Sequence, residues 1–268
     1  QIRAHHYQMT YYMLILMMII FIFYGIKSFK DQSFKLFAKN SIVLIFSGLI
    51  ALGFNAPPLL ATSEYSKFST RGGTELKFNS DGTTKESTGG LSKDYITQFS
   101  YGIFESLNLI APRIQGGGST EDLGDDSDLY EFLVENGASI TQSKEFVANV
   151  PTYWGGQPIL EAPAYVRISV IFLATIALFL VKGPLKNGLF LGVIISLLLS
   201  WGKKFPLLTD LFIDYFPLYN KFRAVSSIQV ILEFCFPILA CMGVYKIFEK
   251  KEKKNLQYIL KISAGFVS

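Results

Sequence analysis

The sequence is poor in the residue types that build metal centres and disulfide frameworks. Its 268 residues include only two cysteines and two histidines. Cys235 and Cys241 fall inside one apolar run, where their spacing and surroundings suit neither a metal site nor a loop-closing disulfide. We expect both to be small core residues. His5 and His6 are neighbours that cannot share a helix face, so the pair does not form a two-ligand metal site, and no third histidine supports a Ser-His-Asp triad.

Charged residues are scarce too, at 17% of the chain, and the formal net charge is only +4. No arginine-rich stripe with interleaved aromatic residues occurs, so nucleic acid is not an expected partner. What the chain has instead is apolar: 50% hydrophobic residues, 15% aromatic residues and a mean hydropathy of +0.34. This composition is too apolar for an ordinary soluble domain of this size and predicts a membrane protein.

The apolar residues gather in runs that approach the length of a membrane span, which takes about 20 helical residues, or somewhat fewer where flanking residues snorkel. Five such runs occupy residues 9–26, 42–54, 165–181, 188–201 and 227–248. A further run, 256–267, begins a sixth, and the chain opens on Gln1 rather than Met, so we expect a piece of a longer polypeptide. The predicted fold class is an all-α polytopic membrane protein with five transmembrane helices and the start of a sixth.

The lysines predict the orientation of these helices. They concentrate after the first, third and fifth runs, at Lys27, Lys30, Lys35, Lys39, Lys182, Lys186, Lys246, Lys250, Lys251, Lys253 and Lys254. All three segments lie on one side if every run spans, and the positive-inside rule makes that side cytoplasmic.

Four regions follow from this topology. Residues 1–56 hold helices 1 and 2 with a cytoplasmic basic loop at 27–41, and residues 57–163 form an extracytoplasmic domain. Residues 164–248 hold helices 3 to 5 with an interfacial helix at 205–216, and residues 249–268 hold a cytoplasmic basic loop and the start of the next helix.

The segment 57–163 carries 15 acidic and 7 basic residues and is too long for a structureless loop, so we expect a domain of helices and loops. The stretch Asp94 to Ile110 reads as an amphipathic, aromatic-rich helix along the membrane surface. Asp128 to Asn136 reads as a short helix with Asp128 as its cap, and Ser143 to Asn149 as another. The acidic run 121–128 contains a D-x-D but lacks the Gly and terminal Glu of a calcium loop, so a solvated loop explains it more simply.

Four basic residues break the charge pattern, because Lys203, Lys204, Lys221 and Arg223 fall on the side predicted to be outside. An anionic partner at that boundary would account for them, and a guanidinium binds phosphate oxygens as a bidentate fork. The alternative is that they contact lipid headgroups or pair with acidic neighbours.

Three acidic residues near these cations are further candidates. Asp210 and Asp214 lie at i and i+4, on one face of the expected interfacial helix. They would orient a sugar, balance the cations, or form only the solvated side of that helix. Glu233 lies about two turns inside the fifth run, with Pro237 disturbing the helix after it. A carboxylate at that depth needs a partner or a cavity, so it is either functional or a hydrogen-bonded structural residue.

Polar and aromatic side chains at two other boundaries are candidate substrate contacts. His5 and His6 precede the first run, and one of them, with Gln8 and Tyr11, could hydrogen-bond a sugar or phosphate. Tyr153, Trp154 and Gln157 end the outer segment, where aromatic residues anchor a membrane protein at the interface or stack against a sugar ring.

Four stretches carry a resemblance to a known family: NAPPLLATSEYSKFSTRGG, DYITQFSYGIFESLNLIAPRI, PTYWGGQPILEAPAYV and LLLSWGKKFPLLTDLFIDYFPLYNKFRAVSS. In this order they resemble the YfhO-type bacterial membrane protein family, of which the chain would be a middle portion. The resemblance implies a GT-C-like fold in the bacterial inner membrane. It also implies a multi-pass glycosyltransferase that takes sugar from a polyprenyl-phosphate donor on the outer face and passes it to a glycan or lipid acceptor.

The resemblance also implies how the site works. Arg223, assisted by Lys221, Lys203, Lys204 and Arg113, would neutralise the donor phosphate as the sugar leaves. The catalytic carboxylate of such enzymes lies in a first outer loop that this chain lacks, so the catalytic residue is unknown here and we expect the fragment alone to be inactive. No metal ligands are assigned, and whether a divalent cation takes part stays open.

Two other classes of function stay open. A lipid or polysaccharide transporter or flippase would also need an intramembrane acid and an anion site. A noncatalytic assembly protein would use the large outer segment for protein contacts, and Arg223 and Glu233 would then matter only for stability.

Overall fold

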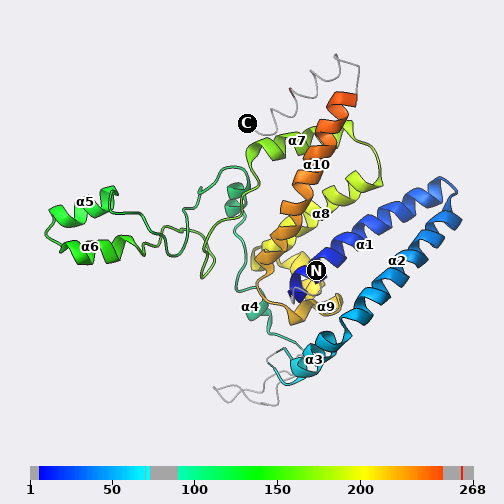
Figure 1. Cartoon of the computed structure of the whole chain (residues 1–268), viewed down its shortest axis with the longest axis horizontal. Helices are drawn as coiled ribbons and strands as arrows, with labels where there is room; N and C mark the ends of the chain where they lie inside the picture. Colours follow the sequence, from blue (N-terminus) through cyan, green and yellow to red (C-terminus); the bar gives the residue numbers. More distant parts are fainter. Residues whose placement is uncertain (1–5, 70, 73–89, 250–260, 262–268) are drawn as a thin grey trace.

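The computed structural model describes residues 6–69, 71–72, 90–249 and 261. Within these residues the secondary structure is helical, with no strand and one isolated bridge between Glu121 and Val150. The prediction of an all-α chain is therefore confirmed for the described part. Figure 1 shows a group of long helices from which two short helices project at one side.

Three stretches are long and apolar enough to cross a membrane: α1 (Tyr7–Lys30), α2 (Phe34–Phe54), and the stretch Val225–Glu249, which contains α10 (Gln229–Glu249). Two shorter apolar helices, α7 (Ile168–Leu180) and α8 (Pro184–Ser200), lie between them in the sequence. Each of the five apolar runs thus forms a helix, and three of them reach spanning length. The expected sixth run falls, apart from Lys261, outside the described residues.

The core lies where α10 packs against α7 and α8, and α8 packs against α1. Glycines permit these close approaches. A Cβ on Gly188 would lie 2.9 Å from Ile20 Cγ1, and one on Gly243 would lie 2.5 Å from the carbonyl oxygen of Leu173. Small residues at such crossings are the usual device by which membrane helices pack closely.

The apolar helices meet where α1 and α10 begin and α8 ends. There Gln8 Nε2 donates to the carbonyl oxygen of Arg223 at 2.6 Å, and Gln229 Nε2 donates to Ser200 Oγ at 3.4 Å. We call this the Arg223 end. Away from it the helices diverge, and Figure 1 shows the turn between α1 and α2 well apart from the end of α10. The helix termini away from the Arg223 end, together named the lysine end, carry Lys27, Lys30, Lys35, Lys39, Lys182, Lys186 and Lys246.

Residues 91–109, named here the capping segment, cover the Arg223 end. The segment consists of α4 (Lys93–Ile96), an extended stretch, and the 3-10 helix η2 (Phe104–Leu109). The prediction of one amphipathic helix over Asp94 to Ile110 is therefore wrong. The backbone of this stretch bonds to other elements instead: Tyr101 N donates to the carbonyl oxygen of Ser200 at 2.8 Å, and Ser226 N donates to that of Phe99 at 3.1 Å.

Helix α9 (Pro206–Tyr215), flanked by the 3-10 turns η3 (Gly202–Lys204) and η4 (Tyr219–Lys221), also lies at the Arg223 end. It matches the helix predicted at 205–216. A further short 3-10 turn, η5 (Val225–Ile228), leads directly into α10. Pro237 lies inside α10 without ending it, so the expected disturbance amounts to no break in the helix.

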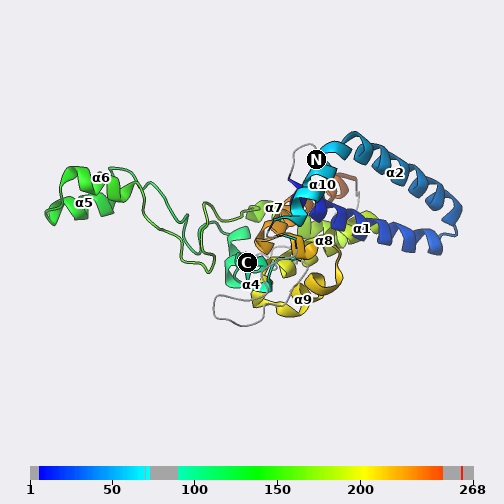
Figure 2. The same cartoon turned by 90° about the horizontal axis from the view of Figure 1, so that it is seen from below.

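Two short helices form an arm that projects away from the long ones, as Figures 1 and 2 both show. They are α5 (Asp128–Glu135) and α6 (Ile140–Val147). Ser127 caps α5 by accepting from Tyr130 N, so the prediction that Asp128 is the cap is wrong. Helix α6 begins three residues before the helix expected at Ser143 to Asn149.

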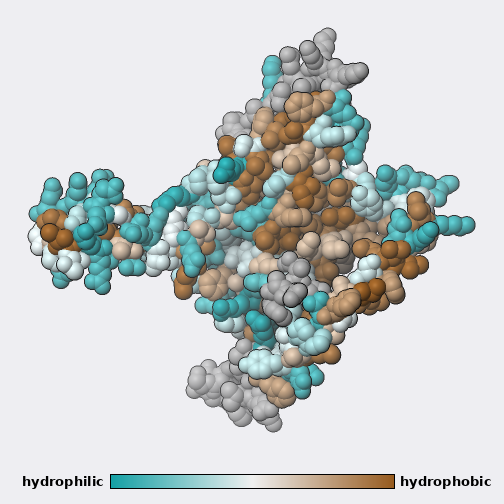
Figure 3. All heavy atoms as spheres, in the orientation of Figure 1, coloured by the Kyte–Doolittle hydropathy of each residue, from teal (hydrophilic) through white to brown (hydrophobic). Residues whose placement is uncertain are grey.

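Helix α2 continues into α3 (Ala56–Lys67), which sequence reasoning did not predict. No residue of α2 is buried. Figure 3 shows apolar atoms over much of the long helices and hydrophilic atoms over most of the arm. Of the two cysteines, Cys235 is buried as expected, whereas Cys241 is exposed on α10 and is not a core residue.

Candidate functional site

Arg223 lies in the turn that leads into α10, at the Arg223 end of the helices. Its Nη1 donates to Tyr95 Oη at 2.7 Å, and its guanidinium carbon lies 5.5 Å from the centre of the Tyr95 ring and 6.0 Å from that of Phe99. The residue is exposed, and no carboxylate of the described residues lies within ion-pair distance of it. Two aromatic rings of the capping segment therefore orient a cation whose charge is not neutralised by those residues.

The backbone around Arg223 is held by α1. Gln8 Nε2 donates to the Arg223 carbonyl and to Tyr12 Oη, and Tyr11 Oη donates to the Pro217 carbonyl at 2.7 Å. Gln8, a predicted sugar or phosphate contact, thus uses its amide to position this turn. His6 is exposed at the start of α1, and His5 lies outside the described residues.

The other predicted cations have contacts of their own near the capping segment. Lys203 and Lys204 are exposed on η3, where Lys203 N donates to Ser100 Oγ at 3.0 Å. Lys221 is half-buried, and its Nζ donates to the carbonyl oxygen of Arg71 at 2.7 Å. Since Phe99 contacts Arg223 and Ser100 contacts η3, the capping segment joins the two basic positions.

Arg113 is held elsewhere. Its guanidinium makes a bidentate ion pair with Glu121, at 2.6 and 2.8 Å, at the base of the arm. The hydrogen bonds from Arg113 and then from the Thr152 hydroxyl lower the pKa of the Glu121 carboxyl. Arg113 therefore has a partner within residues 57–163, in contrast to Arg223.

The two acidic residues of α9 differ in their contacts. Asp210 Oδ2 pairs with Lys93 Nζ at 2.6 Å, which fastens α9 to the capping segment. Asp214 is exposed and makes no ion pair within the described ranges. Neither carboxylate balances Lys221 or Arg223 there.

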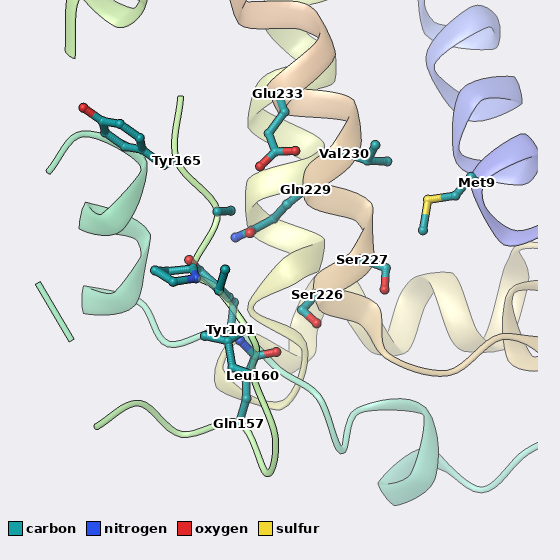
Figure 4. Close-up of a pocket in the computed structure, with 13 residues that line it drawn as sticks. Met9, Tyr101, Gln157, Leu160, Tyr165, Ser226, Ser227, Gln229, Val230 and Glu233 are labelled. Carbon is teal, nitrogen blue, oxygen red and sulfur yellow. The ribbon is translucent and has the colours of Figure 1, made fainter. Parts of the chain in front are cut away.

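A pocket of about 550 Å³ lies beside the start of α10, next to the turn that carries Arg223 (Figure 4). Its walls come from α10 and η5, from the capping segment, and from the stretch 157–165. In Figure 4 the side chains of Glu233 and Gln229 point from α10 toward that stretch. The polar side chains that line the pocket are Tyr101, Gln157, Tyr165, Ser226, Ser227, Gln229 and Glu233, and no lysine or arginine of the described residues lines it.

Two of these polar groups make no hydrogen bond of ordinary geometry to the described residues. Tyr101 is 2% exposed, and its buried hydroxyl has only the Asn108 side chain and the Ala164 backbone close to it. Burial raises the Tyr101 pKa to about 12, so the hydroxyl keeps its proton at neutral pH. The Glu233 carboxylate is partly buried and has neither a hydrogen bond nor an ion pair to a described residue. A buried donor and a carboxylate both face the pocket with hydrogen bonds left to make.

Behind the pocket lies a fully buried carboxylate, Glu105, at 0% exposure. It accepts from Gly102 N at 2.8 Å, from Tyr153 Oη at 2.6 Å and from Gln157 Nε2 at 3.2 Å. Burial and the bond to Glu105 raise the pKa of Tyr153. Tyr153 and Gln157 are thus fixed to one another through this acid, while Trp154 is 83% exposed and free of it.

Sequence reasoning missed Tyr101, Glu105 and Gln229. The first two were assigned to faces of a helix that does not form. Gln229 could have been found, because Gln229 and Glu233 are polar residues at i and i+4 in an otherwise apolar run and so share one face of α10. That face is the one that lines the pocket.

No group of three His, Cys, Asp or Glu side chains suited to a metal ion occurs in the part of the chain that the structure describes. In the acidic run, Asp122 Oδ1 accepts from Gly124 N, and Asp125 pairs with Lys144. These carboxylates belong to the loop that leads into α5.

The comparisons with known proteins gave no relative for this chain. No protein-family model matches it, and neither a curated protein nor a solved structure is significantly similar to it.

Proposed function

We propose that this chain is part of an integral membrane glycosyltransferase that uses a polyprenyl-phosphate-linked sugar on the outer face of the bacterial inner membrane. The proposal includes a GT-C-like protein of the YfhO type, with the Arg223 end outside and the lysine end in the cytoplasm. Membrane lipids, the lipid-linked donor and a glycan or lipid acceptor would be its partners.

The proposal of five spans draws on the packing of the two shorter apolar helices. Helices α7 and α8, although only 13 and 17 residues long, both pack against α10, and α8 also packs against α1. Short spans are accommodated by local thinning of the bilayer and by flanking residues that snorkel. Seven lysines occupy the helix termini away from the Arg223 end, and the positive-inside rule favours a cytoplasmic location for such termini.

One observation carries the functional proposal: the exposed Arg223 guanidinium, oriented by Tyr95 and Phe99, stands unneutralised by described residues where an apolar helix begins. A lipid phosphate sits at that level of a bilayer, and a guanidinium binds it with paired hydrogen bonds. The rings hold one face of the cation and leave its other N–H groups available.

In the proposed reaction the bond between the sugar and the donor phosphate breaks, and the acceptor hydroxyl forms the new glycosidic bond. Negative charge grows on the phosphate oxygens as the sugar leaves. Arg223, with Lys221, Lys203 and Lys204 nearby on the same end, would stabilise that charge where water is partly excluded. The base that takes the acceptor proton is assigned to no residue of this chain.

The test is a label-transfer assay on the intact natural protein in lipid nanodiscs, with radiolabelled polyprenyl-phosphate sugars and a membrane glycan extract. Arg223→Ala should reduce transfer by at least tenfold, as expected for loss of a charge-assisted contact to phosphate. Arg167→Ala is the matched control, because Arg167 is also an exposed arginine before an apolar helix but makes no contact with Tyr95 or Phe99.

Transfer that persists in Arg223→Ala at the wild-type rate would contradict the role of Arg223. Absence of transfer with every donor, together with movement of the labelled lipid between leaflets, would contradict the glycosyltransferase and favour a flippase.

A further inference from the structure

We propose that the pocket beside α10 binds the sugar ring of the lipid-linked donor as an uncharged, hydroxyl-rich group, with Tyr101, Gln229 and Glu233 as its hydrogen-bonding residues. The phosphate stays outside the pocket, at Arg223. This inference rests on the proposed function, since it names where the sugar of that donor lies.

Size and lining agree with such a ligand. The cavity of about 550 Å³ falls within the roughly 300–1,000 Å³ of small-molecule pockets. Its walls combine apolar surface from Met9, Leu160 and Val230 with seven polar side chains. A sugar ring needs this mixture, because its hydroxyls hydrogen-bond at the edge while its C–H faces pack on apolar groups.

Tyr101 adds a hydroxyl to the pocket wall. It is 2% exposed, and the Asn108 side chain and the Ala164 backbone lie close to its hydroxyl without forming a hydrogen bond of ordinary geometry. A bound sugar oxygen would take the proton of this hydroxyl in place of these two weak neighbours.

The charges of the lining exclude the phosphate itself. Glu233 is the one acidic residue that faces the cavity from the described lining, and no basic residue accompanies it there. A phosphate placed next to Glu233 would meet a like charge without a cation, whereas a hydroxyl would donate to the carboxylate. The site is therefore divided into a pocket for an uncharged ligand and an anion-binding rim at Arg223.

The depth of Glu233 adds to this argument. A carboxylate within an apolar helix of spanning length is costly unless it faces a cavity and finds a partner. Gln229 and Glu233 lie on one face of α10, and Figure 4 shows both pointing into the same space. Hydroxyls of a bound sugar would satisfy both side chains together.

Arg223 at the rim and two of the residues that line the pocket lie within five consecutive residues of the chain. Ser226 and Ser227, which line the pocket, both lie in η5 and follow Arg223 by three and four residues. Sugar and phosphate are joined by a single bond in the donor, so one ligand would contact both parts of this turn.

The experiment measures equilibrium binding of radiolabelled polyprenyl phosphate, with and without an attached sugar, to the intact protein in nanodiscs. Glucose, mannose, galactose and N-acetylglucosamine are the sugars used. Wild type should bind at least one sugar-bearing lipid about tenfold more tightly than the bare lipid phosphate. Tyr101→Phe should reduce that preference about three- to tenfold and Glu233→Gln about tenfold, while both leave binding of the bare lipid phosphate unchanged.

Tyr219→Phe is the matched control, because Tyr219 is equally buried, its hydroxyl also lacks a partner among the described residues, and it does not line the pocket. It should bind like wild type. Equal affinity for bare and sugar-bearing lipids across the panel would overturn the inference. Tighter binding of a lipid that carries unacetylated glucosamine than of every neutral sugar in the panel would also overturn it, because Glu233 would then be a cation site. Failure of the bare lipid phosphate to bind at all would instead contradict the proposed function.

Discussion

Helices α2 and α10 are alike in length and hydropathy but differ in how deeply they are buried. Each has 21 residues and belongs to a stretch long and apolar enough to cross a membrane. None of the residues of α2 is buried, whereas α10 buries Gln229, Ile231, Leu232, Cys235, Leu239, Ala240 and Gly243. Hydropathy thus identifies a helix suited to a bilayer but does not tell which helix packs in the core.

The hydrogen bonds of their polar side chains distinguish the two helices more clearly than burial does. Within α10, Gln229 and Glu233 share a face toward a cavity, and the turn before it is bonded to the capping segment. In α2, Ser41 and Ser47 donate to carbonyls of their own helix, at Phe37 and Val43. A polar side chain in an apolar helix points to a site only when its hydrogen bonds are left unmade within that helix.

The largest expected effect on the free energy of unfolding comes from comparing one glycine substitution in each helix. A Cβ at Gly243 of α10 would lie 2.5 Å from the Leu173 carbonyl oxygen, whereas one at Gly48 of α2 would meet no heavy atom within 4 Å. Gly243→Val should therefore lower the free energy of unfolding by about 3 kcal/mol, the upper range for overpacking. Gly48→Val should change it by less than about 0.5 kcal/mol. Unfolding in mixed micelles titrated with denaturing detergent measures both, and equal effects would show that α2 is as tightly packed as α10.

The next largest effect on stability is expected at Glu105, the buried acid that lies behind the pocket next to α10. Glu105→Ala would leave the Tyr153 hydroxyl, the Gln157 amide and Gly102 N without their acceptor. We expect a loss of about 2 kcal/mol in the same titration, because unsatisfied buried donors keep their desolvation cost. The control is Glu145→Ala on the exposed surface of α6, which should have little effect. A neutral Glu105→Ala would mean that water satisfies these donors.

A smaller effect is expected where α9 joins the capping segment. Asp210 and Lys93 form an ion pair, but their side chains are 35% and 53% exposed. Solvent screens such a pair, so Asp210→Asn should cost no more than about 0.5 kcal/mol. Asp214→Asn, four residues later and without an ion pair among the described residues, is the control. If Asp210→Asn cost as much as Glu105→Ala, the pair would be a main fastening of the capping segment.

The smallest effect is a pH dependence at the base of the arm, far from both helices. The folded-state pKa of Glu121 is lowered by Arg113 and Thr152, so its contribution is complete above the unfolded pKa of about 4.3 and is lost as pH falls through the folded pKa. Hydrogen-exchange protection of Val150 N–H, which bonds to the Glu121 carbonyl, should fall at acid pH. Arg113→Ala should shift that fall toward pH 4.3, and an unchanged profile would contradict the assigned cause.

The sequence was sufficient to predict the long helices, because an apolar run of this length has few other structures available. It also predicted α9 and the two arm helices to within a few residues. The prediction failed for the capping segment. Residues 94–110 have a helix-like pattern, but their backbone hydrogen-bonds to Ser200 and Ser226, which lie far away in the sequence. Local periodicity carries no information about such long-range partners.

The candidate site divides in the same way. Arg223 and Glu233 were identified because each breaks a local rule, one of charge and the other of polarity. Tyr101 and Glu105 break no local rule, since a tyrosine and a glutamate are ordinary on an amphipathic helix. Their roles come from tertiary burial, at 2% and 0% exposure.

The central claim is that a lipid phosphate binds at the start of α10 rather than against apolar helix surface in general. Photo-crosslinking of a diazirine-bearing polyprenyl phosphate to the intact protein in nanodiscs, mapped by mass spectrometry, tests it most directly. We predict label on residues 95–101 and 223–233 that disappears in Arg223→Ala and is competed by unlabelled lipid. Label confined to α2, and unchanged in Arg223→Ala, would contradict the claim.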